Sequence, residues 1–186
     1  LDSRVRLTVD KEWLDEVDDT LALTSAVRAV NPDVAVAVQA NLRRTESDVT
    51  ELARAGWRVR LVKGAYRPPA QVAYRRPSDV RDAYRRCGET LLRSTAQPLF
   101  ATHDPLLLAD MRHAARRLGR GTDSYEIQML LGIRPDEQRR LAGEGERVRV
   151  YVPYGPDWYG WFVSRVADRP QTLLLAGRSA WQTAQR

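Results

Sequence analysis

The chain has very few of the residues that build metal centres and disulfide frameworks. Cys87 is its only cysteine, and His103 and His113 are its only histidines among 186 residues. A single cysteine forms neither an internal disulfide nor a cysteine zinc cluster, and two histidines do not supply a histidine-rich metal site. The sequence therefore predicts no metal centre, and its cysteine content fits a reducing compartment.

Long hydrophobic runs are also missing. Nothing approaches the ~18 consecutive apolar residues that a membrane-spanning helix needs. The first residues, LDSRVRLTVD, have neither an initiator Met nor a signal-peptide pattern. With 43% hydrophobic and 29% charged residues the composition is that of a globular protein. We expect one partial domain over residues 1–186, as a fragment of a longer gene product.

An excess of positive charge could indicate nucleic-acid binding, because the net charge is +6. However, the Arg-Arg pairs are scattered along presumed helices and loops and are mixed with Asp and Glu. No helix-turn-helix, zinc finger or RNP-like aromatic motif accompanies them. We therefore predict no nucleic-acid partner.

Short apolar runs alternate with helical patterns along the chain. The runs are VRLTVD (5–10), VAVAVQA (34–40), VRLVKGA (59–65), LFATHD (99–104), YEIQMLL (125–131) and VRVYVPY (148–154). Between them apolar residues recur at three- and four-residue steps, as in Val80, Tyr84, Cys87 and Leu91. Helix-start signals include Thr45 with Asp48, Ser78 before Asp79, and Asp104-Pro105. Six strand–helix repeats predict a parallel sheet with crossover helices.

Polar residues gather where the predicted strands end, which bears on the choice between an open sheet and a barrel. These residues are Asp10, Gln39, Arg60, Lys63, His103, Asp104, Glu126, Gln128 and Tyr151. In a βα barrel the functional groups project from that rim, whereas an open doubly wound sheet usually has a Gly-rich turn after its first strand. No G-x-G-x-x-G or P-loop sequence is present. The pattern favours about six βα units of an α/β (βα)8 TIM-like barrel, truncated at the N-terminus by two units.

The stretch RVRLVKGAYRPP (58–69) places two cations in and directly after an apolar strand. Near the carboxyl end of a barrel strand, Arg60 and Lys63 could hold an electron-rich or anionic ligand. Gly64 would let a ligand approach the backbone, and Tyr66 adds a flat face and a hydroxyl. An equally weighted alternative is that the cations only form ion pairs with Asp10 or Glu126 on neighbouring strands.

Five motifs in order resemble the FAD-dependent proline dehydrogenases. They are VQANLRR, VRLVKGAY, FATHDP, YEIQMLLGIR and RVRVYVPYGPDWYGWFVSRVADRP, and they cover the chain from Leu7 to about Pro170. The resemblance implies a distorted (βα)8 barrel of which this chain is the last six units. It also implies oxidation of L-proline to Δ1-pyrroline-5-carboxylate, with hydride transfer to the flavin N5 and a membrane quinone as electron acceptor.

The resemblance also implies roles for individual residues. Arg60 resembles the arginine beside flavin N5, where a cation stabilises the reduced ring. The other expected cofactor residues are Gln39, Lys63, Gly64, Ala65, Thr102, His103 and Gln128. The expected substrate residues are Asp10, Tyr66, Leu130 and Tyr151. Of all these, Arg60, Asp10 and Tyr151 are the expected catalytic residues.

The last helix departs from the family. Its pattern there is Tyr-x-x-Arg-Arg-x-x-Glu, with paired arginines that clamp the substrate carboxylate. The matching residues here are Trp161, Ser164, Arg165 and Asp168. Trp161, Arg165 and Asp168 remain expected substrate residues, but Ser164 replaces one arginine. Because a charged hydrogen bond contributes about 1.5–3 kcal/mol, this loss should weaken proline binding.

Two further implications and one alternative follow. The implied location is cytoplasmic, with peripheral association at the inner face of the membrane where the quinone lies. The family's first-strand lysine is expected outside this chain. The alternative is a truncated, non-catalytic relative that binds flavin weakly or serves as an interaction module, or a flavin amine dehydrogenase with another substrate; Ser164 and Trp161 favour it.

Overall fold

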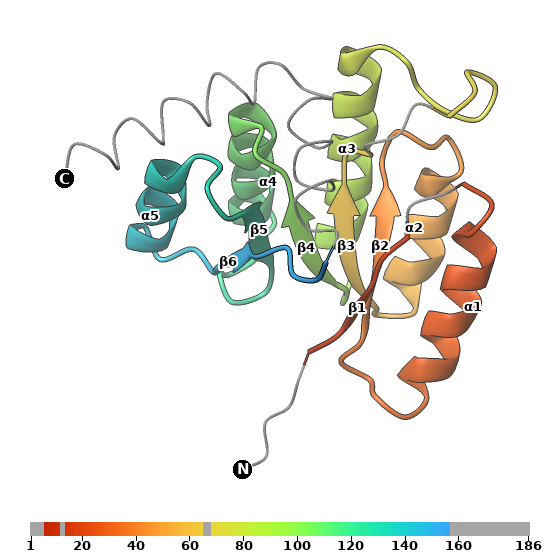
Figure 1. The fold of residues 1–186 in the computed structure, drawn as a ribbon. Coiled ribbons are helices and arrows are strands. Elements are labelled where there is room, and N and C mark those ends of the chain that lie inside the picture. Colours follow the sequence, from red (N-terminus) through yellow and green to blue (C-terminus); the bar gives the residue numbers. More distant parts are fainter. Residues whose placement is uncertain (1–5, 12–13, 65–67, 157–186) are drawn as a thin grey trace.

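The computed structural model describes residues 6–11, 14–64 and 68–156, which form a six-stranded sheet covered by helices. The strands are β1 (Thr8–Val9), β2 (Ala35–Gln39), β3 (Arg58–Val62), β4 (Gln97–Ala101), β5 (Glu126–Leu130) and β6 (Val148–Tyr151). The helices are α1 (Val17–Arg28), α2 (Thr45–Arg54), α3 (Pro77–Leu92), α4 (Pro105–Arg117) and α5 (Pro135–Gly143). All strand pairs are parallel and follow chain order, so each crossover connects neighbouring strands (Figure 1).

The sheet is curled, and its two faces differ in chemistry. On the outer face, alternate strand residues are apolar and buried against the helices: Val36, Val38, Val59, Leu61, Phe100, Ile127 and Met129. Phe100 lies at the centre of this core, with its ring centroid 6.5 Å from that of Tyr84 and 5.9 Å from that of Tyr125. Burial of this apolar face against the helices holds the helices onto the sheet.

The inner face carries polar and small residues. Register places Ala37 of β2 beside Arg60 of β3, and Arg60 beside Leu99 of β4. One position along, Ala101 of β4 pairs with Gln128 of β5, which pairs with Arg149 of β6. The side-chain period of a strand thus assigns Arg60 and Gln128 to the inner face. Small neighbours leave space there for long polar side chains.

The helix starts agree in part with the sequence signals. Asp104 caps α4 as expected, because its carboxylate accepts a hydrogen bond from the Leu106 N–H at 3.1 Å. Thr45 begins α2 but donates its hydroxyl to the Gln39 carbonyl at 2.6 Å and so joins the helix to β2. Ser78 is not a cap, since α3 already begins at Pro77, and its hydroxyl lies beside the Asp79 carboxylate.

The predicted partial barrel of about six βα units is confirmed for the described residues. Six parallel strands occur at the expected places, although β1 has only two residues where the sequence suggested 5–10. The strand order leaves β1 and β6 at the two edges of a curled α/β sheet. Within the described ranges, no helix is long and apolar enough to cross a membrane.

Gly88 of α3 offers a test of this packing. A methyl group at Gly88 would overlap the sulfur of Met111 on α4 and lie 3.3 Å from the ring of Phe100. We expect Gly88→Ala to lower the free energy of unfolding by about 1–3 kcal/mol, as overpacking does. Gly143→Ala in α5, where a methyl group meets nothing, should instead raise it by about 0.5–1 kcal/mol. Urea unfolding of both variants measures the difference, and equal behaviour would contradict the close α3–α4 contact.

Candidate active site

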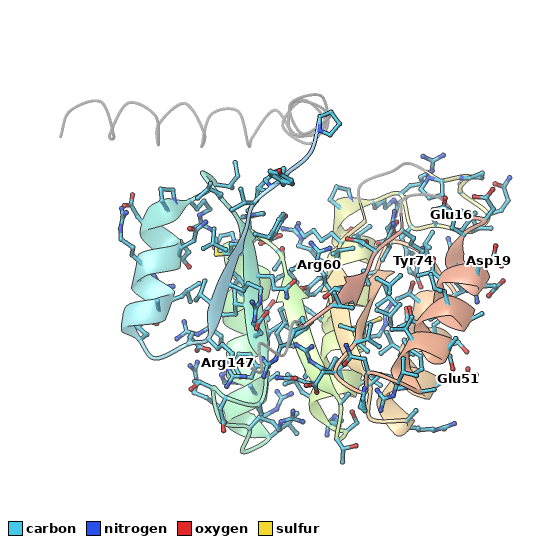
Figure 2. The ribbon with its side chains drawn as sticks, turned by 60° about the horizontal axis from the view of Figure 1, so that its bottom comes forward. Glu16, Asp19, Glu51, Arg60, Tyr74 and Arg147 are labelled. Atoms are coloured by element: carbon cyan, nitrogen blue, oxygen red, sulfur yellow. The ribbon has the colours of Figure 1, made fainter. Side chains whose placement is uncertain are left out.

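Arg60 is the centre of a polar cluster on the inner face (Figure 2). Its Nε donates to Oε1 of Gln128 at 3.0 Å, and its Nη1 forms an ion pair with the Asp10 carboxylate. Its guanidinium carbon lies 5.2 Å from the ring centroid of Tyr151, a cation–π contact. Four residues expected at the site, from β3, β5, β6 and the end of β1, are therefore brought together.

The cluster is partly open to solvent. The Arg60 side chain is 16% exposed and that of Asp10 is 53% exposed. An ion pair at such a position keeps the guanidinium in place while leaving carboxylate oxygen accessible. The suggested pairing of Arg60 with Asp10 is thus confirmed, and it is compatible with ligand binding because about half of the Asp10 side chain remains exposed.

Lys63 forms an ion pair that was not predicted from the sequence. Its Nζ lies 2.5 Å from Oδ2 of Asp104, the residue that caps α4. Burial alone would raise the pKa of Asp104, but the hydrogen bond and charge of Lys63, with backbone N–H groups of α4, outweigh burial and hold that pKa below its usual value. Lys63 therefore presents its charge beside the first turn of α4.

Gly64 follows directly and has a conformation that favours glycine. Its φ is +100°, and a Cβ there would overlap the side chain of Asn41. The Asn41 N–H donates to the Lys63 carbonyl at 3.0 Å, so the segments after β2 and β3 are in close contact. The absence of a side chain at Gly64 is thus required by the fold, because Asn41 occupies the space that a side chain would need.

His103 joins the ends of β4 and β5. Its Nε2 accepts a hydrogen bond from the Leu130 N–H at 2.8 Å, and its carbonyl accepts from Nη1 of Arg134 at 2.9 Å. A nitrogen that accepts carries no proton, so the neutral ring has its hydrogen on Nδ1. The ring nitrogen beside the Leu130 backbone is thus the acceptor, and the side chain ties the segment after β4 to the end of β5.

The remaining expected residues divide into two groups. Gln39 and Thr102 are buried at strand ends, and the Thr102 hydroxyl accepts from the Asp104 N–H at 3.2 Å. The other residues lie outside the described ranges, and these are Ala65, Tyr66, Trp161, Ser164, Arg165 and Asp168.

Two charged residues beside the cluster were not predicted as site residues. Glu126 accepts from Nε2 of Gln128 at 2.7 Å and is fully buried. Arg149 of β6 donates to both oxygens of Glu126, at 2.7 and 2.8 Å. A signal was present in the sequence, because Arg149 is a lone charge in the apolar run VRVYV.

The donor set at the mouth suits an electron-rich or anionic ligand. Arg60 and Lys63 supply positive charge, and Gln39 carries an amide at the adjacent strand end. Such groups stabilise negative charge that develops on a bound ring. Among the residues that the structure describes, no group of three or more His, Cys, Asp or Glu is placed to hold a metal ion.

The sequence profile of the family described as Proline dehydrogenase matches residues 1–158. The chain belongs to the proline dehydrogenase family. It is 37% identical over 173 residues to "Proline dehydrogenase 2" of Bacillus subtilis (strain 168), covering 93% of this chain and 57% of that protein. It is 43% identical over 142 residues to "Proline dehydrogenase" of Deinococcus radiodurans, covering 76% and 46% respectively.

Solved structures agree with the fold. The proline utilization A protein (PutA) from Bdellovibrio bacteriovorus, inactivated by N-propargylglycine, superposes with a TM-score of 0.81 at 25% identity, over 93% of this chain and 21% of that chain. A Bradyrhizobium japonicum PutA mutant, D779W, has a TM-score of 0.74 at 29% identity, over 88% and 19%. The chain spans about half of the length of the curated relatives it matches.

The Lys63–Asp104 pair should stabilise the fold in a pH-dependent way. Lys63→Met should lower the free energy of unfolding at pH 7 by about 1.5–3 kcal/mol. Because the folded-state pKa of Asp104 is lowered, this stabilisation is present above the unfolded-state pKa and is lost as pH falls through the folded-state value. Denaturant titrations of both proteins at pH 7 and pH 3 measure the effect.

Arg93→Met is a matched control for that experiment, because Arg93 makes an exposed 3.6 Å pair with Glu89 that should contribute about 0–1 kcal/mol. A Lys63→Met loss of the same size at both pH values would show that Asp104 is not the partner.

Proposed function

We propose that the protein oxidises L-proline to Δ1-pyrroline-5-carboxylate, with FAD as the cofactor. The observation that carries this proposal is the Arg60 cluster on the inner face of the sheet, in a chain that belongs to the proline dehydrogenase family. When bound, FAD would accept a hydride from the substrate carbon next to nitrogen. The activity would belong to the whole protein, of which this chain supplies the six-stranded part described above.

The residues present fit a flavin. Arg60 is fixed on two sides by Asp10 and Gln128, so its cation is preorganised near the position where a reduced ring would carry negative charge. Lys63 is a second cation directly after the same strand, and Gly64 follows it with a backbone conformation that favours glycine. These contacts support the assignment of Arg60, Lys63 and Gly64 to the cofactor.

The substrate would meet the other side of the cluster. The half-exposed carboxylate of Asp10 can receive the amine of proline while it holds Arg60. The ring of Tyr151, already stacked on Arg60, would border the pyrrolidine ring and exclude water. Leu130, on the inner face of β5 with its N–H held by His103, adds an apolar contact. We assign the substrate carboxylate to Arg165 on the family pattern alone.

The electron acceptor and the location form part of the same proposal. We infer a quinone as acceptor, and a cytoplasmic protein that associates with the inner face of the membrane to reach it. Family membership supports both inferences.

The direct test uses the full-length protein purified with added FAD. Bound flavin gives an absorbance band near ~450 nm, and anaerobic L-proline should bleach it. Binding without bleaching would favour a non-catalytic relative or another amine as substrate, an alternative that Ser164 and Trp161 keep open. Absence of the band would overturn the flavin assignment.

Arg60 can be tested separately. Arg60→Ala should slow reduction of bound flavin by proline at least tenfold and shift its reduction potential to more negative values, because the reduced ring loses its cation. Arg60→Lys should have a smaller effect, since it keeps the charge but loses the fork that meets both Asp10 and Gln128. Stopped-flow reduction and potentiometry measure the two quantities, and unchanged values in Arg60→Ala would remove Arg60 from this role.

The halved carboxylate clamp gives a further prediction. With Arg165 and Ser164 where the family has two arginines, the wild-type KM for proline should be high. Ser164→Arg should lower it by about tenfold, since one charged hydrogen bond contributes about 1.5 kcal/mol. Ser164→Gln is the matched control and should lower it less, because it adds length without charge. A low wild-type KM that Ser164→Arg does not improve would contradict the clamp interpretation.

A further inference from the structure

Glu126 is a fully buried carboxylate that the proposed function does not use. It lies on β5, two residues before Gln128, on the same inner face and one step deeper than the mouth. Taking a carboxylate out of water is unfavourable, so its partners must compensate. Its position two residues before Gln128 places it in contact with the amide of that side chain.

Arg149 and Gln128 provide that compensation. Arg149 binds Glu126 through two parallel hydrogen bonds of 2.7 and 2.8 Å, and Gln128 Nε2 donates to the same carboxylate at 2.7 Å. Burial alone would raise the pKa of Glu126, but these hydrogen bonds and the charges of Arg149 and Arg58 outweigh it and hold that pKa below its usual value. The carboxylate is therefore ionised and can only accept.

An acceptor-only neighbour fixes the orientation of the Gln128 amide. An amide has a donor end and an acceptor end, and its donor end must face the carboxylate. The acceptor end, Oε1, then points at Arg60 Nε, 3.0 Å away. The reversed amide would place oxygen against carboxylate and NH2 against guanidinium, losing both bonds.

We propose that Glu126, held by Arg149, is a positioning residue that orients Arg60 through the Gln128 amide. The chain of contacts runs Arg149–Glu126–Gln128–Arg60 and crosses β6, β5 and β3. Its consequence for flavin chemistry rests on the proposed function, whereas its consequence for the Arg60 side chain does not.

Glu126→Gln tests the proposal with little change in shape. Glutamine can donate as well as accept, so the Gln128 amide loses its fixed direction. The charge left behind is that of Arg149, whose side chain is 51% exposed and can be solvated. In the FAD-bound full-length protein we expect about a tenfold slower reduction by proline and a more negative reduction potential.

A double-mutant cycle separates positioning from general destabilisation. In a Gln128→Met background, Glu126→Gln should add little to either quantity, because the connection to Arg60 is already broken. Glu146→Gln is the matched control, since Glu146 is also buried and is bound by Arg112 and Tyr125, away from Arg60. It should lower the melting temperature while leaving the reduction potential unchanged.

Arg149→Lys provides a second route, should Glu126→Gln fold poorly. It keeps the charge but loses the two-bond fork, so the same changes should appear with smaller size. Effects of Glu126→Gln that add fully to those of Gln128→Met, or that Glu146→Gln reproduces, would overturn the proposal.

A cofactor-free measurement keeps the proposal distinct from the proposed function. In the ¹⁵N NMR spectrum, the Arg60 Nε–H signal should be sharp and slow to exchange in wild type and Glu146→Gln, and broadened or lost in Glu126→Gln and Gln128→Met. If wild type binds no FAD, the proposed function fails while this spectrum still decides the role of Glu126. A signal unchanged in Glu126→Gln would overturn that role even if FAD binds.

Discussion

A guanidinium on the inner face of β3 needs acceptors, and the rest of the site depends on how they are supplied. Arg60 is mostly buried, so leaving its donors unsatisfied would cost more than the side chain contributes by packing. The acceptors come from other strands: Asp10 after β1 and Gln128 on β5, with the face of Tyr151 on β6. One side chain thus ties the sheet's first strand to its last two.

This dependence explains why the strand register matters for chemistry as well as for stability. Each strand has alternate residues on the two faces, so a shift of one residue in β5 would bury Ile127 inward and turn Gln128 toward the helices. The apolar outer face, with Phe100 against Tyr84 and Tyr125, prevents such a shift. The helix-facing core therefore fixes the positions of polar groups that it never contacts.

Much of the fold and part of the site could be predicted from the sequence. Short apolar runs closed by polar, Gly or Pro residues predicted six strands in their correct places, and polar residues in and after those runs pointed to Asp10, Arg60 and Gln128. The partners of these side chains were harder to predict. Sequence spacing indicates the face of the sheet and the end of the strand on which a residue lies, but not how far its side chain reaches. Lys63 forms an ion pair with Asp104, a residue that the sequence predicts as a helix cap. The sequence shows that Glu126 is a polar residue of its strand. It does not show that the carboxylate is buried and paired with Arg149 on the neighbouring strand.

The hydrogen bond between Arg60 and Gln128 must cross β4, the strand that lies between β3 and β5. In a flat sheet, β3 and β5 would lie about 9.5 Å apart, with β4 in the path. Curling shortens that path, and Ala101 of β4, level with Gln128, contributes only a methyl group to the inner face. A bulkier side chain there would block the crossing and push the guanidinium aside. Ala101 lies in the FATHDP motif without making a polar contact in this cluster, and the clearance that its neighbours need limits which residues that position can accept.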